Sequence, residues 1–205
     1  MWLRPLPFAI VLLMMLSACG GDDESDRTTT TARPARSQAA VAATPKEETM
    51  AFSLTSDSFT DSESIPAHFT CDADDVSPAL KWRGVPDDTQ SFALIMDDPD
   101  APSGTFTHWL IYNMSSQAGG LPEGVQKTER PTNGEGGMQG RNDFGDSGYG
   151  GPCPPGGNPH RYNFRLYALD GRLDLDPGAS KDELLKAMEG RILGETTLTG
   201  TYKRR

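Results

Sequence analysis

The chain has 205 residues, enough for one domain with additional segments or for two small domains. Its formal net charge of -10 argues against a nucleic-acid-binding protein, because phosphate backbones require clustered Lys and Arg, and only Lys203, Arg204 and Arg205 approach a basic cluster. Three cysteines are too few for a disulfide scaffold, so a packed core must supply the stability.

Residues 1–19 have the features of an export signal. Arg4 precedes an apolar stretch of about a dozen residues, and small residues come just before Cys19. The stretch is shorter than the ~20 residues that span a bilayer. The sequence LSAC resembles the bacterial lipobox, in which cleavage leaves a lipid-bearing cysteine as the new N-terminus; an ordinary signal peptide or an uncleaved anchor is the alternative. We expect an exported cell-envelope lipoprotein that is anchored to a bacterial membrane through Cys19.

Residues 20–50 contain no aromatic residue and almost no large aliphatic one. Such a segment cannot bury enough apolar surface to offset the entropy of ordering, so we predict a disordered linker. Residues 51–205 are long enough for one domain with its own core.

The predicted elements of this domain are mainly strands. Four segments are short, rich in β-branched or aromatic residues and separated by Gly, Pro and Asp: 91–98, 106–114, 162–170 and 197–204. Weaker strands are predicted at 50–56 and 78–85. Strands with one late helix favour a mainly β fold, a β-sandwich with the helix packed against it.

That helix is predicted in residues 180–193. Ser180 is expected to be its N-cap, and Glu183 to complete a capping box. One apolar stripe is expected to face the core, formed by Leu184, Leu185, Met188 and Ile192.

The segment 127–159 has ten glycines and no sustained hydrophobic period. Loops longer than ~15 residues in a compact domain tend to be functional or disordered. Disorder is the alternative, but the second half, RNDFGDSGYGGPCPP, mixes aromatic residues and prolines with its glycines. This composition favours a packed loop with a restricted backbone.

Three polar residues lie where apolar strand faces end. Alternation places His108 on one face with Leu110 and Tyr112, His160 at the start of another apolar face, and Asp98 at the end of a third. An acid and two imidazoles beside a Gly/Pro loop are typical of a small ligand pocket. The alternative is that each histidine is a buried structural residue and that Asp98 only shapes its turn. The third histidine, His68, is expected on the surface without a partner.

Two long motifs occur in this domain, DDPDAPSGTFTHWLIYN and GRNDFGDSGYGGPCPPGGNPHRYNFRLYALD. They resemble the signature pair of the phosphatidylethanolamine-binding protein family, also called Raf kinase inhibitor-like proteins, in its bacterial branch. The resemblance extends from FTCDADDVSPALKW to LTGTYKR. It implies a fold of two antiparallel sheets with a small anion-binding pocket near one edge.

By motif position, the resemblance implies nine ligand-binding residues: Asp98, Asp100, Phe106, His108, Gly151, Cys153, Pro155, His160 and Tyr162. Asp98 is then the pocket acid, Asp100 supports its turn, and Gly151 offers its backbone amide to the anion. Phe106 departs from the eukaryotic relatives, which have tryptophan there. We also expect no counterpart of their C-terminal helix, so the contribution of that helix is not carried over.

The imidazoles are expected to donate to the anion, and a nearby carboxylate to raise their pKa values and keep them protonated. We therefore expect non-catalytic binding of a small phosphate-bearing ligand, without a cofactor or metal. The alternatives are inhibition of a protease or kinase, a metal site built on two histidines and a carboxylate, and a hydrolase with Ser103 or Ser147 as nucleophile.

Cys71 and Cys153 would meet an oxidising compartment after export. A disulfide between them is therefore chemically reasonable. The sequence leaves open whether the two residues lie close enough to pair.

Overall fold

The computed structural model describes residues 50–204. The predicted signal segment with Cys19, and the predicted linker up to residue 49, lie outside the described residues. Within residues 50–204, no helix is long and apolar enough to cross a membrane.

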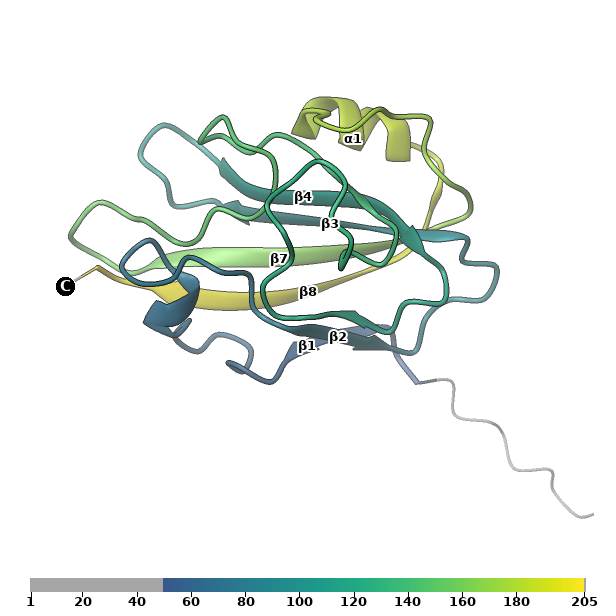
Figure 1. The fold of residues 1–205 in the computed structure, drawn as a ribbon. Helices are drawn as coiled ribbons and strands as arrows, with labels where there is room; N and C mark the ends of the chain where they lie inside the picture. Colours follow the sequence, from purple (N-terminus) through teal and green to yellow (C-terminus); the bar gives the residue numbers. More distant parts are fainter. Residues whose placement is uncertain (1–49, 205) are drawn as a thin grey trace, which may run out of the picture. The chain divides into compact units, whose positions relative to one another are not determined.

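The described chain forms two antiparallel sheets and one α-helix (Figure 1). The larger sheet has the strand order β6-β4-β3-β7-β8, and the smaller sheet has the order β1-β2-β5. The predicted fold class, a mainly β protein with two antiparallel sheets, is confirmed. In chain order the elements are β1 (Ser53–Ser56), the 3-10 helix η1 (Ala67–Phe69), β2 (Leu80–Arg83), β3 (Ser91–Asp98), β4 (Phe106–Ser115), β5 (Gly120–Leu121), β6 (Met138–Gln139), β7 (His160–Leu169), α1 (Lys181–Met188) and β8 (Ile192–Tyr202).

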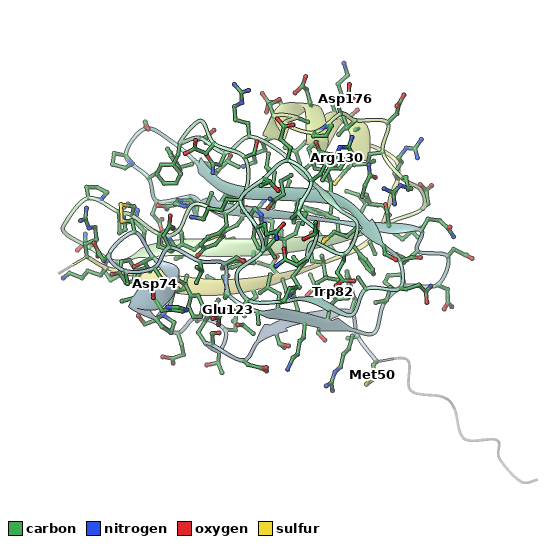
Figure 2. All side chains as sticks on the ribbon, viewed as in Figure 1. Met50, Asp74, Trp82, Glu123, Arg130 and Asp176 are labelled. Atoms are coloured by element: carbon green, nitrogen blue, oxygen red, sulfur yellow. A yellow bond between two sulfur atoms is a disulfide. The ribbon has the colours of Figure 1, made fainter. Side chains whose placement is uncertain are left out.

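Both faces of the larger sheet are covered. Every residue of β3 is buried, as expected for a central strand with packing on two sides. One face packs against the smaller sheet, and Trp82 of β2 lies between the two sheets (Figure 2). The other face packs against α1, which lies across β3 and β4 (Figure 1).

Helix α1 is shorter than predicted, and β8 is longer. The capping box forms as expected, because the Ser180 hydroxyl accepts from the Glu183 N–H and the Glu183 carboxylate accepts from the Ser180 N–H. Gly190, with a φ of 72°, then turns the chain away, and β8 already begins at Ile192. A positive φ is easily adopted by glycine and ends helices frequently.

The apolar stripe predicted for this helix is only half correct. Leu184 and Met188 are buried against the larger sheet, as expected. Leu185 and Ile192 are 40% and 45% exposed. The helix ends before Ile192, so that residue follows the alternation of a strand and not the period of a helix.

A bulge in β4 decides which way His108 points. Met96 of β3 pairs with Trp109, whereas the next residue, Asp97, pairs with Thr107. His108 is therefore an extra residue on β4 that has no partner on β3. An inserted residue of this kind shifts the side-chain alternation of the strand by one position.

This bulge corrects an expectation from the sequence. Simple alternation placed His108 on one face with Leu110 and Tyr112, but those two side chains belong to the cluster beneath α1. The His108 ring instead packs edge-on against Tyr162, with ring centroids 5.2 Å apart. Tyr162 belongs to the core between the two sheets. His108 therefore lies on the face of the larger sheet that packs against the smaller sheet.

Candidate functional site

A cavity of about 230 Å³ lies where β3 ends and where β4 and β7 begin. Because both neighbours of β3 run antiparallel to it, the end of β3 meets the starts of β4 and β7 at one edge of the sheet. Asp98, His108 and His160, far apart in sequence, thus meet at one cavity. Its lining comprises Asp98, Ala101, Pro102, Ser103, Phe106, His108, Phe144, Cys153, Pro154, Pro155 and His160.

Asp98 and His160 form a buried pair in this cavity. The Nδ1 atom of His160 lies 2.7 Å from Oδ2 of Asp98, and both side chains are almost fully buried. The other carboxylate oxygen, Oδ1, accepts a hydrogen bond of 2.8 Å from the backbone N–H of Asp100. Since an ionised carboxylate only accepts, Nδ1 of His160 carries the proton in this bond. The Nε2 atom is then the ring nitrogen left for a ligand.

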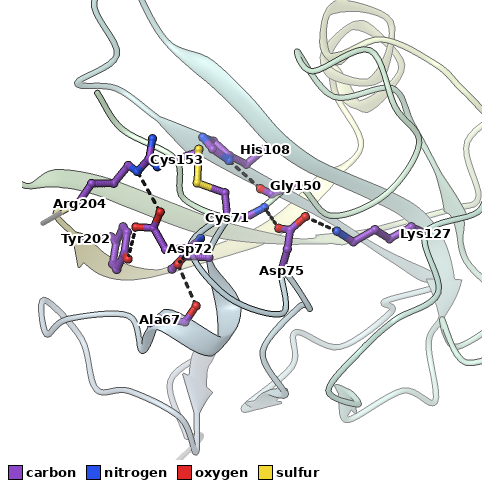
Figure 3. Close-up of a disulfide and its surroundings, with 12 residues drawn as sticks. Ala67, Cys71, Asp72, Asp75, His108, Lys127, Gly150, Cys153, Tyr202 and Arg204 are labelled. Atoms are coloured by element: carbon purple, nitrogen blue, oxygen red, sulfur yellow. Dashed lines mark hydrogen bonds and ion pairs between the residues drawn. A yellow bond between two sulfur atoms is a disulfide. The ribbon is translucent and has the colours of Figure 1, made fainter. Parts of the chain in front are cut away.

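His108 is held in one tautomer by the backbone. Its Nδ1 atom lies 2.7 Å from the carbonyl oxygen of Gly150, and a carbonyl can only accept, so Nδ1 carries a proton (Figure 3). Burial lowers the pKa of His108, against the weaker opposing effects of the Gly150 carbonyl and Asp98. The expectation that a neighbouring carboxylate raises the pKa is therefore wrong for His108, because desolvation is the larger effect.

Tyr162 lies behind His108 and does not line the cavity. Its hydroxyl is the single buried side-chain N or O atom in the described chain that has no hydrogen-bond partner. Burial, followed by the charge of Asp98, raises the pKa of this hydroxyl, so it stays protonated. The expectation that Tyr162 forms part of the pocket wall is corrected by its position: it supports the His108 ring from the core.

Gly151 also differs from its expected role. Its backbone N–H donates to Oδ1 of Asp75 at 2.6 Å, so this amide is not free for an anion. A Cβ at this position would lie 2.5 Å from the carbonyl oxygen of Phe69. Glycine is required here for close approach of two backbone segments. Asp75 also accepts from Nζ of Lys127 at 2.6 Å (Figure 3).

The wall after Gly151 is linked covalently to a distant segment. Cys153 forms a disulfide with Cys71, which follows η1, and the two Cα atoms are 5.4 Å apart (Figure 3). The backbone N–H of Cys71 also donates to the carbonyl oxygen of Pro152 at 3.2 Å. Pro154 and Pro155 continue this wall along the cavity.

Asp100 lies outside the cavity and supports the turn, as the resemblance implied. Its carboxylate accepts from the backbone N–H, Nε and Nη2 of Arg161 at 2.9, 2.9 and 2.7 Å. These bonds lower the pKa of Asp100 to about 2. The pair ties the turn after β3 to the start of β7, and it engages the guanidinium of Arg161.

His68 is on the surface, but the expectation that it has no partner is wrong. Its Nδ1 lies 2.6 Å from Oδ2 of Asp74, and its Nε2 lies 3.2 Å from Oε1 of Glu123. His68 and Glu123 lie far apart in the sequence, so no local pattern indicated this contact.

Phe144 belongs to the glycine-rich segment 127–159 but is not among the nine ligand-binding residues that the motifs implied. Phe144 lines the cavity, and its ring meets Phe106 edge-on with centroids 4.8 Å apart. An aromatic residue inside a glycine-rich loop was the available signal. Only the folded loop shows that this ring is at the mouth of the cavity.

Comparisons with known proteins show similarity to one protein family. The sequence profile described as phosphatidylethanolamine-binding protein matches residues 55–203, which include every residue that lines the cavity. A UPF0098 protein of Methanothermobacter thermautotrophicus is 53% identical over 151 residues, covering 74% of this chain and 98% of the relative. A UPF0098 protein of Chlamydia muridarum is 40% identical over 155 residues, covering 73% and 97%.

Two crystal structures share the fold. A phosphatidylethanolamine-binding protein homologue from Chlamydia trachomatis has a TM-score of 0.69 and 38% sequence identity, and the match covers 76% of this chain and 99% of that one. YbcL of E. coli, described as a member of the mammalian family, has a TM-score of 0.69 and 33% identity, with coverages of 75% and 99%.

Proposed function

We propose that this chain, which belongs to the phosphatidylethanolamine-binding protein family, binds a small phosphate-bearing or other anionic ligand without catalysis. The observation that carries the proposal is the convergence of His108 and His160 on one cavity with both Nδ1 atoms already bonded within the protein. Each ring then offers its Nε2 atom to a ligand. Two directional groups at the floor of a small cavity suit the oxygens of one oxyanion.

Among the described residues that line this pocket, the imidazoles are the side chains that can carry positive charge. No lysine or arginine is among the described residues that line it, and the nearby Arg161 is bonded to Asp100. Asp98 is already paired with Nδ1 of His160 at 2.7 Å. An anion bound at Nε2 of His108 would favour the protonated form of the His108 ring. Binding of the anion is thus coupled to uptake of a proton.

A non-catalytic role fits the arrangement of the hydroxyl that lines the pocket. A serine nucleophile needs a base within hydrogen-bond reach. Ser103 lines the cavity, but within residues 50–204 no hydrogen bond joins it to His108 or His160. We therefore propose binding and not hydrolysis as the activity of the pocket.

The test is calorimetric titration of the protein with inorganic phosphate, comparing wild type with His160→Ala. The variant removes one charge-assisted hydrogen bond, so binding should weaken by about 1.5 to 3 kcal/mol. His68→Ala is the matched control, because it removes a histidine whose two ring nitrogens bond to surface acids. It should leave the affinity unchanged. Equal affinities of wild type and His160→Ala would refute the proposed site.

We further propose that the protein acts on the outside of a bacterial membrane, held there by lipid on Cys19. The support is the sequence of the first nineteen residues, with its short apolar stretch and the LSAC tetrad. A lipid anchor would keep the pocket near a membrane surface, where phosphate-bearing head groups are abundant.

A further inference from the structure

Phe144 is a large apolar residue held at the mouth of the pocket. Its side chain is 47% exposed, although it lines the cavity. Its ring meets both Phe106 and His108 edge-on, with centroid distances of 4.8 and 5.3 Å. One part of the ring therefore packs on the pocket wall, and the rest remains available to a ligand.

The turn that carries Phe144 is held by hydrogen bonds. Oδ1 of Asn142 accepts from the backbone N–H groups of Phe144 and Asp146 at 3.0 and 3.1 Å, and its Nδ2 donates to the Gly148 carbonyl at 3.0 Å. Asn142 is itself buried. The same side chain therefore fixes the turn on both sides of Phe144.

A second contact ties this turn to β4. The backbone N–H of Asp143 donates to the carbonyl oxygen of Thr107 at 2.9 Å, and Oδ2 of Asp143 accepts from the Thr107 N–H at 2.6 Å. The residue before Phe144 is thus attached to the residue before His108. A ring held in this way loses little conformational entropy when it contacts a ligand.

The pocket combines a polar floor with an apolar rim. The buried polar side chains of the lining are those of the Asp98–His160 pair and of His108. The remaining lining side chains are mostly apolar: Ala101, Pro102, Phe106, Phe144, Pro154 and Pro155. Inorganic phosphate would use only the floor. A substituent esterified to the phosphate would lie against the rim.

We propose that Phe144 is a specificity-determining residue, which makes the pocket prefer phosphate monoesters with a planar or apolar substituent. This inference rests on the proposed function, because it presupposes an anion at the two imidazoles. The preformed ring provides an aromatic surface, and aromatic pairs add stabilisation beyond the apolar area that they bury. The substituent of the ligand, and not its anionic group, is what Phe144 recognises.

The test compares methyl phosphate with phenyl phosphate by calorimetric titration of the full-length protein. The two probes carry the same anionic group, so their affinity ratio reports the substituent. Wild type should bind phenyl phosphate about tenfold more tightly, given the usual strength of aromatic contacts. In Phe144→Ala the preference for phenyl phosphate, taken as the ratio of the two affinities of that variant, should fall below about threefold.

Two further variants control the experiment. Leu185→Ala truncates a similarly exposed apolar side chain on α1, which does not line the pocket, and should keep the wild-type preference. Phe144→Leu keeps apolar bulk over Gly150 and guards against a folding defect in the alanine variant. It should lose most of the preference for phenyl phosphate, because it has no aromatic face.

The outcomes separate the two proposals. If wild type binds methyl phosphate but does not prefer phenyl phosphate, the role of Phe144 is refuted and the anion site stands. The same conclusion follows if Phe144→Ala keeps the preference, or if it weakens both probes equally. If wild type binds neither probe, the anion site fails, and the inference about Phe144 fails with it.

Discussion

The pKa values of His108 and His68 are shifted in opposite directions, because the two imidazoles lie in different surroundings. Burial lowers the pKa of His108, whereas hydrogen bonds to Asp74 and Glu123 raise the pKa of His68. The folded protein therefore binds fewer protons at His108 than the unfolded chain does, so the contribution of His108 to stability is present above 6.5 and is lost as pH falls from 6.5 through its lowered pKa. His68 has the opposite sign: its contribution is present below 6.5 and is lost as pH rises through its raised pKa.

The lowered pKa of His108 predicts that anion affinity rises as pH falls. At neutral pH the free ring is neutral and its Nε2 can only accept, so binding must supply a proton. Sulfate is the suitable probe, because its own charge stays constant over this range. Its affinity should increase by up to about tenfold per pH unit between about pH 7.5 and 5.5 for each proton taken up.

The check is calorimetric titration with sulfate at several pH values. The variant His108→Gln keeps a side-chain donor but cannot titrate, so its affinity should depend less steeply on pH. A pH-independent affinity of the wild type would show that His108 does not couple the anion to a proton.

Among the elements, the wall of the pocket is unusual because it belongs to no strand or helix. The segment from Tyr149 to His160 is backed by the last residue of η1 and by the residues that follow it. Tyr149 donates from its hydroxyl to the Phe69 carbonyl at 2.7 Å, and the Gly151 amide donates to Asp75. From Cys153 to Pro159, the disulfide is the only described bond to another part of the chain. The position of this part of the wall therefore depends on the disulfide.

Breaking the disulfide should destabilise the domain and weaken ligand binding together. The bond joins residues separated by 82 positions. Removing a disulfide that closes a loop of that length should lower the free energy of unfolding by about 2 to 5 kcal/mol. Urea denaturation with and without reductant measures this loss in wild type. Cys71→Ser should have the same urea midpoint with and without reductant, equal to that of the wild type in the presence of reductant. If the urea midpoint of the wild type does not change when reductant is added, the prediction is contradicted.

At the scale of the whole molecule, the sandwich separates two functions of the larger sheet. Its two faces supply the core, against the smaller sheet and against α1. Its edge at the end of β3 supplies the pocket. The proposed tether precedes this domain in the chain, so attachment and ligand binding use different parts of the sequence.

The proposed tether predicts where the protein is found. In a bacterial host, the full-length chain should sediment with membranes and incorporate a labelled fatty acid, because a lipid-bearing cysteine anchors without a membrane span. Cys19→Ser should remove the label. Cys71→Ser and Cys153→Ser, which change the other two cysteines, should keep it. Membrane association without any label in wild type would exclude lipid on Cys19.

Local sequence determined most elements of this fold. The strands at 91–98 and 106–115 and the capping box at Ser180 lie where alternation and capping residues placed them, because these signals act between residues near in sequence. The motif resemblance also assigned Asp98, His108 and His160 to one pocket. Those assignments needed no information on distant contacts beyond the motifs themselves.

Tertiary structure decided what local signals do not contain. The bulge that turns His108 toward Tyr162 is visible only in the pairing of β4 with β3. The partners of His68 and the loss of the Gly151 amide to Asp75 join segments distant in the chain. Whether a backbone amide is free, or an imidazole is charged, depends on what the fold packs against it. Desolvation and hydrogen bonding are properties of that packing, so only the folded chain determines them.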